Sequence, residues 1–274
     1  MGIAIIIPNA SFAGSPLGRV TKAETTEEKI SAYLTSVGAD DTKKEKLITL
    51  YDSLEELGVL STLDVFPMLG SSLANKLKPL NSVNFDTLIV GNNASSGTIG
   101  VDFTNTVAAS VSQYTTVDKD FDNAYVFASV KRSGELAQSI FAYHTGGGVT
   151  ANGYIFRSVS KDSKKAMVAT NSGGSGTISQ AVESDGVFVD ISVAITNSDI
   201  KNMTGGIQTA SESHNFSTVK YNMNNVIGCD ALKGDAESYP NAKSFGGSCR
   251  MYAIGFVPAD KVSQVDAAFR TYLA

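Results

Sequence analysis

The spacing of hydrophobic residues divides the chain into a helical segment and a longer β region. Apolar residues recur at helical spacing over 26–37 and again over 42–57, and Gly38 and Gly58 are the stop signals. These stretches predict an αα-hairpin, which is too small to be stable in water on its own. It must therefore pack on the next domain or on a partner.

Both predicted helices have N-terminal signals. Glu27 and Glu28 lie in the first turn of the first helix, where the helix dipole favours acidic side chains. Asp41 and Thr42 are candidate N-caps of the second helix, and Glu45 three residues after Thr42 completes the pattern of a capping box.

The hydrophobic period changes to two between about residues 83 and 257. Runs of β-branched and aromatic residues alternate there with glycine-containing turns such as 146–148 and 204–206. The predicted strands include 124–130, 153–159, 165–170, 187–195 and 250–257. Short strands at this spacing are typical of an antiparallel β-sandwich rather than of βαβ units. Helical spacing returns after Pro258 and predicts a C-terminal helix.

The pattern predicts a mainly β protein in three parts. These are an N-terminal arm over 1–20, a helical hairpin and connector over 21–81, and a sandwich with a terminal helix over 82–274. Residues 21–57 hold 14 charged residues, which sets them apart from the weakly charged remainder. The connector over 59–81 is too apolar for a free linker, so we expect it to lie across the surface of the sandwich.

Composition excludes several classes of protein. A net charge of −5 and a pI near 5.1 argue against a basic surface that binds nucleic acid. No apolar run approaches the length of a membrane span, so no membrane partner is predicted. Pro8 interrupts the apolar start and the first basic residue is Arg19, a pattern unlike that of a secretory signal peptide.

Two apolar surfaces are candidates for contact with partners. An isoleucine-rich arm ahead of the folded domains offers unpaired N–H groups for β-augmentation. Its docking residues are Ile3, Ile5, Ile6, Ile7 and Phe12. The predicted oligomer or partner interface consists of Leu47, Leu50, Leu54 and Phe66. These side chains need cover, which the sandwich or a neighbouring copy in a symmetric homo-oligomer would supply.

No arrangement of residues points to catalysis. His144 and His214 lie in turn-rich segments, and we interpret them as loop histidines rather than members of a Ser-His-Asp site. Glu183 and Asp185 come nearest to the paired carboxylates of a sandwich glycoside hydrolase, but the third acidic residue is missing. We therefore predict no catalytic residues and no enzymatic activity.

No cofactor or metal site is assigned, with calcium as the alternative. Asp118, Asp120 and Asp122 alternate and could supply oxygen ligands, although the EF-hand glycine and glutamate are missing. The two cysteines, Cys229 and Cys249, are too few for a zinc site. They are interpreted as two semi-buried thiols, with a disulfide between adjacent strands as the alternative.

Sugar binding would use tyrosine as its aromatic platform, because the chain contains no Trp. The candidate glycan contacts are Tyr143, Tyr154, Asn152 and Tyr221. Asn222 and Asn224 lie nearby in the sequence.

Several segments resemble known families. Residues 246–255, a glycine-rich approach to a last strand that a helix follows, resemble the concanavalin A-like or laminin-G-like jelly-roll superfamily. Residues 57–67 and 77–81 resemble a segment that precedes such domains in bacteriophage virion proteins, and 17–21 resembles the arm of phage structural proteins. The resemblance implies an antiparallel jelly-roll sandwich and a virion surface component: a head fibre, capsid decoration or tail appendage.

The same resemblance implies partners and a location. The partners would be other virion proteins of the capsid or tail, further copies of the chain, by resemblance a trimer, and host-surface glycans. The location would be the virion, assembled in the host cytoplasm. The alternative functions are a carbohydrate-binding, lectin-like module and, after it, a glycoside hydrolase.

Overall fold

The computed structural model describes residues 23–81, 83, 94–104, 116–119, 123–133, 138–144, 154–159, 186–195, 199–213, 221–227 and 245–274. The predicted docking arm, including Ile3, Ile5, Ile6, Ile7 and Phe12, lies outside these residues. The strand predicted over 165–170 also lies outside them.

Three helices form where the apolar spacing predicts them: α1 (Thr26–Val37), α2 (Lys44–Glu56) and α4 (Val262–Leu273). The 3₁₀ helix η1 (Asp41–Lys43) and the short helix α3 (Leu73–Lys76) were not predicted. A capping box starts α1, in which Thr25 accepts from the backbone N–H of Glu28 and Glu28 accepts from that of Thr25. Gly38 ends α1 in the left-handed conformation, with φ at +64°.

The capping box predicted at Thr42 and Glu45 is wrong. Asp40 caps η1 by accepting a hydrogen bond from the backbone N–H of Thr42, at 2.9 Å. Thr42 therefore lies inside the 3₁₀ helix, and α2 begins after Lys43 without a side-chain cap.

Within the described residues, the strands form two antiparallel sheets. Sheet A has the order β10 (Ile207–Ser213), β9 (Asp199–Thr204), β8 (Phe188–Ile195), β5 (Ala124–Arg132), β12 (Gly247–Phe256), β3 (Val101–Phe103) and β2 (Ala94–Ser96). A further strand of sheet A, β1 (Leu63–Phe66), also pairs with β12. Sheet B has the order β4 (Thr116–Lys119), β11 (Tyr221–Ile227), β6 (Gln138–His144) and β7 (Tyr154–Val159). Antiparallel sheets with helices near both ends confirm the predicted fold class, and the jelly roll is consistent with them.

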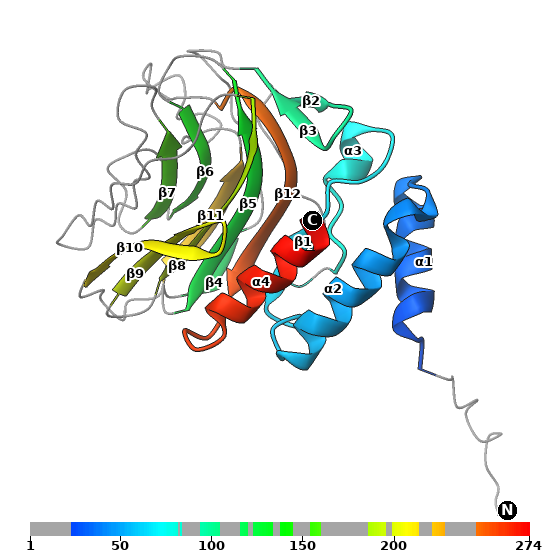
Figure 1. The fold of residues 1–274 in the computed structure, drawn as a ribbon, viewed down its shortest axis with the longest axis horizontal. Coiled ribbons are helices and arrows are strands. Elements are labelled where there is room, and N and C mark those ends of the chain that lie inside the picture. Colours follow the sequence, from blue (N-terminus) through cyan, green and yellow to red (C-terminus); the bar gives the residue numbers. More distant parts are fainter. Residues whose placement is uncertain are drawn as a thin grey trace, which may run out of the picture.

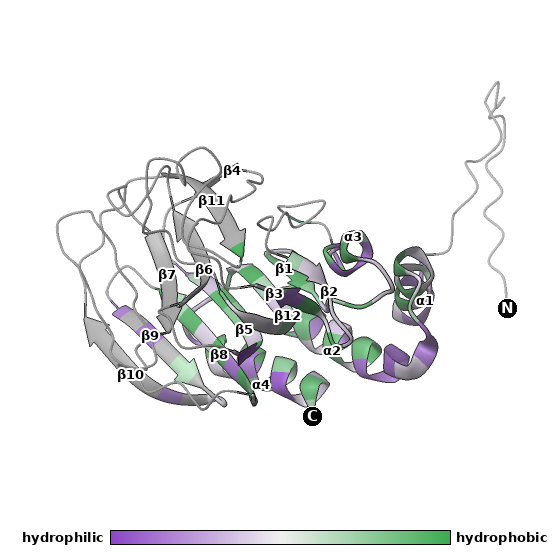
Figure 2. Ribbon diagram, turned by 90° about the horizontal axis from the view of Figure 1, so that it is seen from above, coloured by the Kyte–Doolittle hydropathy of each residue, from purple (hydrophilic) through white to green (hydrophobic). Residues whose placement is uncertain are grey.

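Sheet A is the middle layer of the molecule, with α1, α2 and α4 on one face and sheet B on the other (Figure 1). Successive residues of β5 point to opposite faces. Tyr125 and Phe127 belong to the core under the helices, whereas Val126 and Ala128 belong to the core that includes Ile227 of β11. The helices are accordingly amphipathic, with both hydrophobic and hydrophilic residues on each (Figure 2).

Part of the connector is buried in sheet A and does not lie on the surface as predicted. Its residues Leu63–Phe66 form β1, whose side chains are all buried and which pairs in register with β12. This short strand was missed because its partner lies almost 190 residues further along the chain, too far for local periodicity to reveal.

The predicted interface residues are buried in their own chain. Leu47, Leu50, Leu54 and Phe66 are each at most 1% exposed. The fold of a single chain buries these four side chains, so no partner is needed to cover them. They therefore give no reason to expect a homo-oligomer. The oligomeric state and the trimer stay predictions.

None of the described helices is both long and apolar enough to span a membrane.

Candidate functional site

The structure places three of the four predicted glycan contacts in sheet B. Tyr143 lies in β6, Tyr154 begins β7 and Tyr221 begins β11, whereas Asn152 lies outside the described residues. His144, which the sequence analysis interpreted as a loop residue, is instead the last residue of β6.

One row of residues crosses all four strands of sheet B. The register pairs Thr116 with Asn224, Asn224 with His144, and His144 with Tyr154. Residues directly opposite each other in antiparallel strands share a face of the sheet. At the usual strand spacing the row is about 14 Å long, which suits an extended oligosaccharide rather than a single sugar.

The buried residue Ile227 identifies which face carries this row. Ile227 belongs to the core between the two sheets, and Asn225 and Tyr221 occupy positions of the same parity on β11. Tyr143 is paired with Asn225 and shares that inner face. The row that contains Tyr154 has the opposite parity, so it occupies the outer face of sheet B. The predicted tyrosines are therefore divided between the two faces.

Neighbouring rows on the outer face differ in polarity. Asp118 is paired with Asn222 on one side of the row. On the other side, Ala142 is paired with both Val226 and Phe156. Amide, carboxylate and imidazole groups can hydrogen-bond to sugar hydroxyls, and aromatic rings provide apolar surface. The outer face thus combines the two types of group that the sequence analysis required.

Sequence reasoning missed the grouping of Thr116 and His144 with Asn224. The alternation of Asn222 and Asn224 was a usable signal, because residues two apart on a strand share a face. The partners across the sheet depend on the register between strands that are distant in sequence, which no local pattern shows.

Most of the other chemical candidates lie outside the described residues. These are His214, Glu183, Asp185, Asp120, Asp122 and Cys229. Asp118 lies in β4. Cys249 is a buried free thiol whose pKa is raised by burial to about 12, so it is not a nucleophile at neutral pH.

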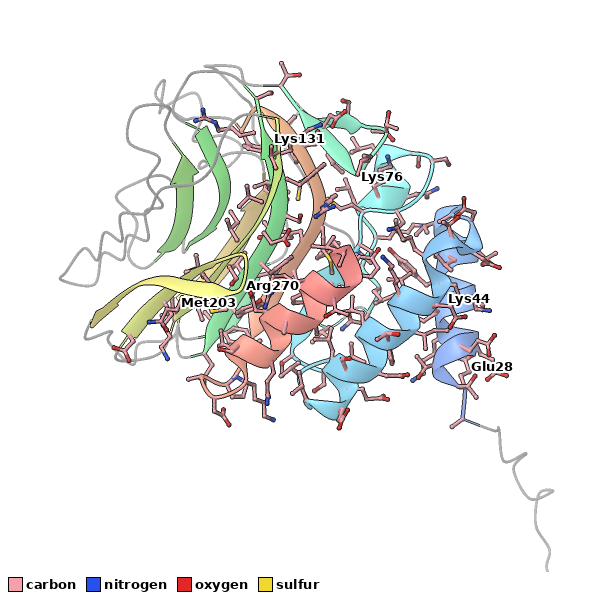
Figure 3. All side chains as sticks on the ribbon, in the orientation of Figure 1. Glu28, Lys44, Lys76, Lys131, Met203 and Arg270 are labelled. Carbon is pink, nitrogen blue, oxygen red and sulfur yellow. The ribbon has the colours of Figure 1, made fainter. Side chains whose placement is uncertain are left out.

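A buried carboxylate ties α4 to sheet A. Asp266 is 1% exposed and accepts hydrogen bonds from Ser192 at 2.5 Å and from Tyr125 at 3.4 Å. Arg270, one turn further along α4, donates from Nε to Asp266 Oδ2 at 3.3 Å (Figure 3). Burial raises the pKa of Asp266 against these favourable contacts. The carboxylate has no access to solvent, so we regard this cluster as structural.

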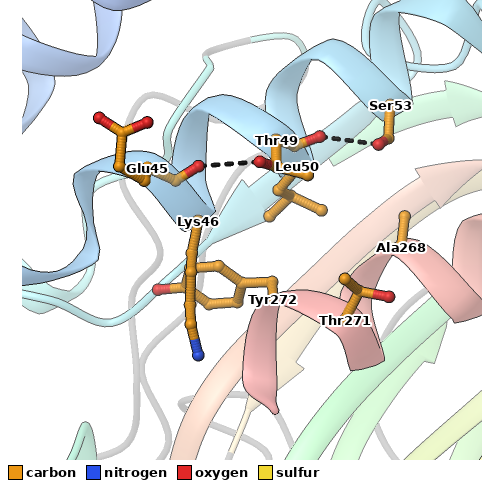
Figure 4. A pocket seen from close by; sticks show the side chains of 8 residues that line it. All are labelled: Glu45, Lys46, Thr49, Leu50, Ser53, Ala268, Thr271 and Tyr272. Atoms are coloured by element: carbon orange, nitrogen blue, oxygen red, sulfur yellow. Dashed lines mark hydrogen bonds between the residues drawn. The ribbon is translucent and has the colours of Figure 1, made fainter.

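A cavity of about 290 Å³ lies between α2 and α4 (Figure 4). Two of its hydroxyl groups already donate to backbone carbonyls, Thr49 to Glu45 and Ser53 to Thr49. Such bonds within one helix leave these hydroxyls weak partners for a ligand. The cavity is therefore a poorer candidate than the outer face of sheet B.

Comparison with known proteins shows the fold. No family model matches the sequence, and no curated protein matches it. Domain 4 of an extracellular arabinanase from Geobacillus stearothermophilus, solved with arabinotriose, is similar with a TM-score of 0.50 and 13% identity, over 76% of this chain and 98% of that domain. A Trypanosoma rangeli sialidase mutant with trans-sialidase activity gives a TM-score of 0.52 and 6% identity, over 82% of this chain and 39% of that one.

The CBM40 domain of a Ruminococcus gnavus sialidase, solved with α2,3-sialyllactose, gives a TM-score of 0.42 and 14% identity, over 60% of this chain and 97% of that one. At these identities, all below 25%, the likeness shows the fold alone. The virion assignment stays a prediction from the resemblance.

Proposed function

We propose that this chain is a carbohydrate-binding module without catalytic activity, and that its ligand lies on the outer face of sheet B. The observation that carries the proposal is the row formed by Thr116, Asn224, His144 and Tyr154. It joins hydrogen-bonding groups to an aromatic residue across the full width of one sheet.

The arrangement of the layers supports this choice of face. The helices cover one side of sheet A, and the inner face of sheet B contributes Ile227 to the core on the other side. Polar and aromatic positions in register on neighbouring antiparallel strands suit an extended sugar chain, because several strands can contribute contacts side by side. The arabinanase domain, whose fold is similar, was solved with arabinotriose.

The absence of catalysis is part of the proposal. A glycosidase needs two carboxyl groups at a defined separation on either side of the scissile bond. Among the described residues of the outer rows, one position is acidic, Asp118, and it lies beside amide and imidazole residues. This set provides for binding and lacks the second carboxyl group. The virion assignment is compatible with such a module, since host-surface glycans were among its predicted partners.

A binding screen with a matched pair of variants tests the proposal. The full chain is applied to a glycan array that includes arabinotriose, and the affinity for the best glycan is measured by calorimetry. Asn224→Ala should weaken binding about tenfold, the effect of losing one or two hydrogen bonds to the ligand. Asn225→Ala, one position along on the inner face, should leave affinity within about twofold.

Circular dichroism confirms that both variants are folded before their affinities are compared. Tyr154→Ala and Tyr143→Ala form a second pair with the same expectation, because the register assigns them to opposite faces. Equal losses in both members of each pair, or no binding to any glycan on the array, would overturn the proposal.

A further inference from the structure

A second cavity lies where the helical layer meets the edge of sheet A. Its volume is about 410 Å³. The segment after β1, helix α3, the turn between β2 and β3, and the end of α4 surround this corner of the molecule (Figure 1). The described lining residues are Lys43, Pro67, Met68, Leu69, Gly70, Lys76, Thr98, Ile99, Gly100, Arg250, Tyr272 and Leu273.

The charge of this cavity is opposite to that of the protein. Three of its described lining residues, Lys43, Lys76 and Arg250, are basic and none is acidic. The whole chain has a net charge of −5. Positive groups that converge on a concave surface attract anions, and the surrounding low-dielectric walls strengthen the effect.

Lys76, which lines the cavity, is held in place by hydrogen bonds. It is only 4% exposed, and its Nζ donates to the carbonyl oxygens of Gly97 and, at 2.9 Å, of Gly100 (Figure 3). An ammonium group has three donors, so one remains for a ligand. Burial lowers the pKa of Lys76 and the nearby charge of Asp102 opposes that effect, as a bound anion would also do.

The Arg250 guanidinium is held by contacts with β5 and β8. Its Nε donates to Ser129 Oγ at 2.8 Å, and its Nη2 lies 3.6 Å from Asp190 Oδ1. The guanidinium also lies over the ring of Phe188, 4.6 Å from the ring centre. A guanidinium has five donors, and these contacts leave some of them for a ligand.

The remaining wall is apolar. Met68, Ile99 and Tyr272 line it, and Ile99 is 56% exposed although most residues of its size in the described chain are buried. An exposed apolar residue at the rim of a charged cavity can cover the uncharged part of a ligand.

We propose that this cavity binds a carboxylate carried on a compact body with an apolar face, as in an acidic monosaccharide. Lys76 and Arg250 receive the carboxylate, Lys43 adds charge at the rim, and Ile99 and Tyr272 contact the body. The site lies on another side of sheet A from the outer face of sheet B, so it does not depend on the function proposed above.

Three probes test the site on the full chain: D-glucuronate, D-glucose and acetate. Binding is measured by calorimetry and located by NMR shifts of the backbone amides of residues 68–70 and 98–100. Glucuronate should bind saturably and glucose should not, because glucose lacks the carboxylate. Acetate should bind about tenfold more weakly than glucuronate, since it lacks the body that the apolar wall contacts.

A matched pair of variants removes one charge inside and one outside the cavity. Lys43→Gln should weaken glucuronate binding about threefold or more, whereas Lys46→Gln should leave it unchanged within error. Lys46 is a suitable control because it lines the cavity between α2 and α4 instead. Arg250→Gln should cause a loss of about tenfold or more.

Several results would overturn the proposal. They are equal binding of glucose and glucuronate, equal binding of acetate and glucuronate, and equal effects of the two lysine variants. If glucuronate shifted only the NMR signals of residues 221–227, the result would also contradict the proposal and would place the anion on sheet B. If these tests fail, the proposed function of sheet B can still be tested on its own with the variants Asn224→Ala and Asn225→Ala.

Discussion

The two faces of sheet A are covered in different ways. On the helix side, Phe269 of α4 stacks on Phe127 with ring centres 4.7 Å apart, and Asp266 adds polar contacts to Ser192 and Tyr125. On the side of sheet B, the core is apolar and includes Ile227 and the edge-to-face pair of Phe103 and Phe245.

This difference indicates that the helical layer and sheet B have different roles in the protein. Helices α1, α2 and α4 share one continuous core with β1, β5, β8 and β12, so they belong to the scaffold and are not an appended hairpin. Sheet B contributes its inner face to the other core, and its outer face carries the polar and aromatic row. Three predictions test whether the helical layer is as integral as this comparison implies.

The largest effect is expected for Phe269→Ala. Phe269 is fully buried and stacks on both Tyr125 and Phe127. Its loss should lower the free energy of unfolding by about 3–5 kcal/mol, the usual effect of removing a buried aromatic ring. Urea unfolding followed by circular dichroism should show a single transition at lower urea. Val187→Ala, at a position that is 56% exposed, is the control. Two separate transitions would mean that the helices unfold independently of sheet A.

A smaller, pH-dependent effect is expected for Asp266→Asn. Burial raises the pKa of Asp266 above its ordinary value of 3.8, so the folded state binds this proton more tightly than the unfolded state does. Protonation of Asp266 therefore stabilises the folded chain. This contribution is fully present below the ordinary pKa of 3.8, and it is lost as the pH rises through the higher pKa of the folded state. The free energy of unfolding of the natural chain should therefore fall relative to that of the variant from about pH 4 upward.

Urea titrations at several pH values measure this difference. Asparagine keeps an oxygen that can accept from Ser192 and Tyr125, so the variant is expected to fold. Parallel curves for the two proteins across the whole range would show that Asp266 has the same pKa in the folded and unfolded chain.

The smallest effect concerns the helix starts. Glu28→Ala should cost about 1 kcal/mol because it removes the capping box of α1. Glu45→Ala should stay within about 0.5 kcal/mol, since Glu45 is in the first turn of α2 but forms no capping box. Both variants lose a similar interaction with a helix dipole, so their difference isolates the cap. Equal costs in thermal or urea unfolding would contradict this.

The sequence predicted those elements whose signals are local. The bounds of α1 follow from apolar spacing and Gly38, and α4 follows from the spacing after Pro258. The 3₁₀ helix before α2 was missed, because Asp40, Asp41 and Thr42 are all good capping residues and sequence alone does not choose among them.

The candidate site was predicted in its residue types but not in its grouping. Tyr143 and Tyr154 both suit a sugar platform, yet pairing with Asn225 and with His144 assigns them to opposite faces. The second cavity had no sequence signal at all, since Lys76 and Arg250 are 174 positions apart in the chain. Register and tertiary contact, not periodicity, bring such residues together.

A crystal structure of the full chain with the best oligosaccharide from the array would show where the ligand binds. We expect sugar density on the outer face of sheet B, with hydrogen bonds to Asn224 or His144 and a sugar ring against Tyr154. Density confined to the helical layer, or to the inner-face residues Tyr143 and Tyr221, would contradict it.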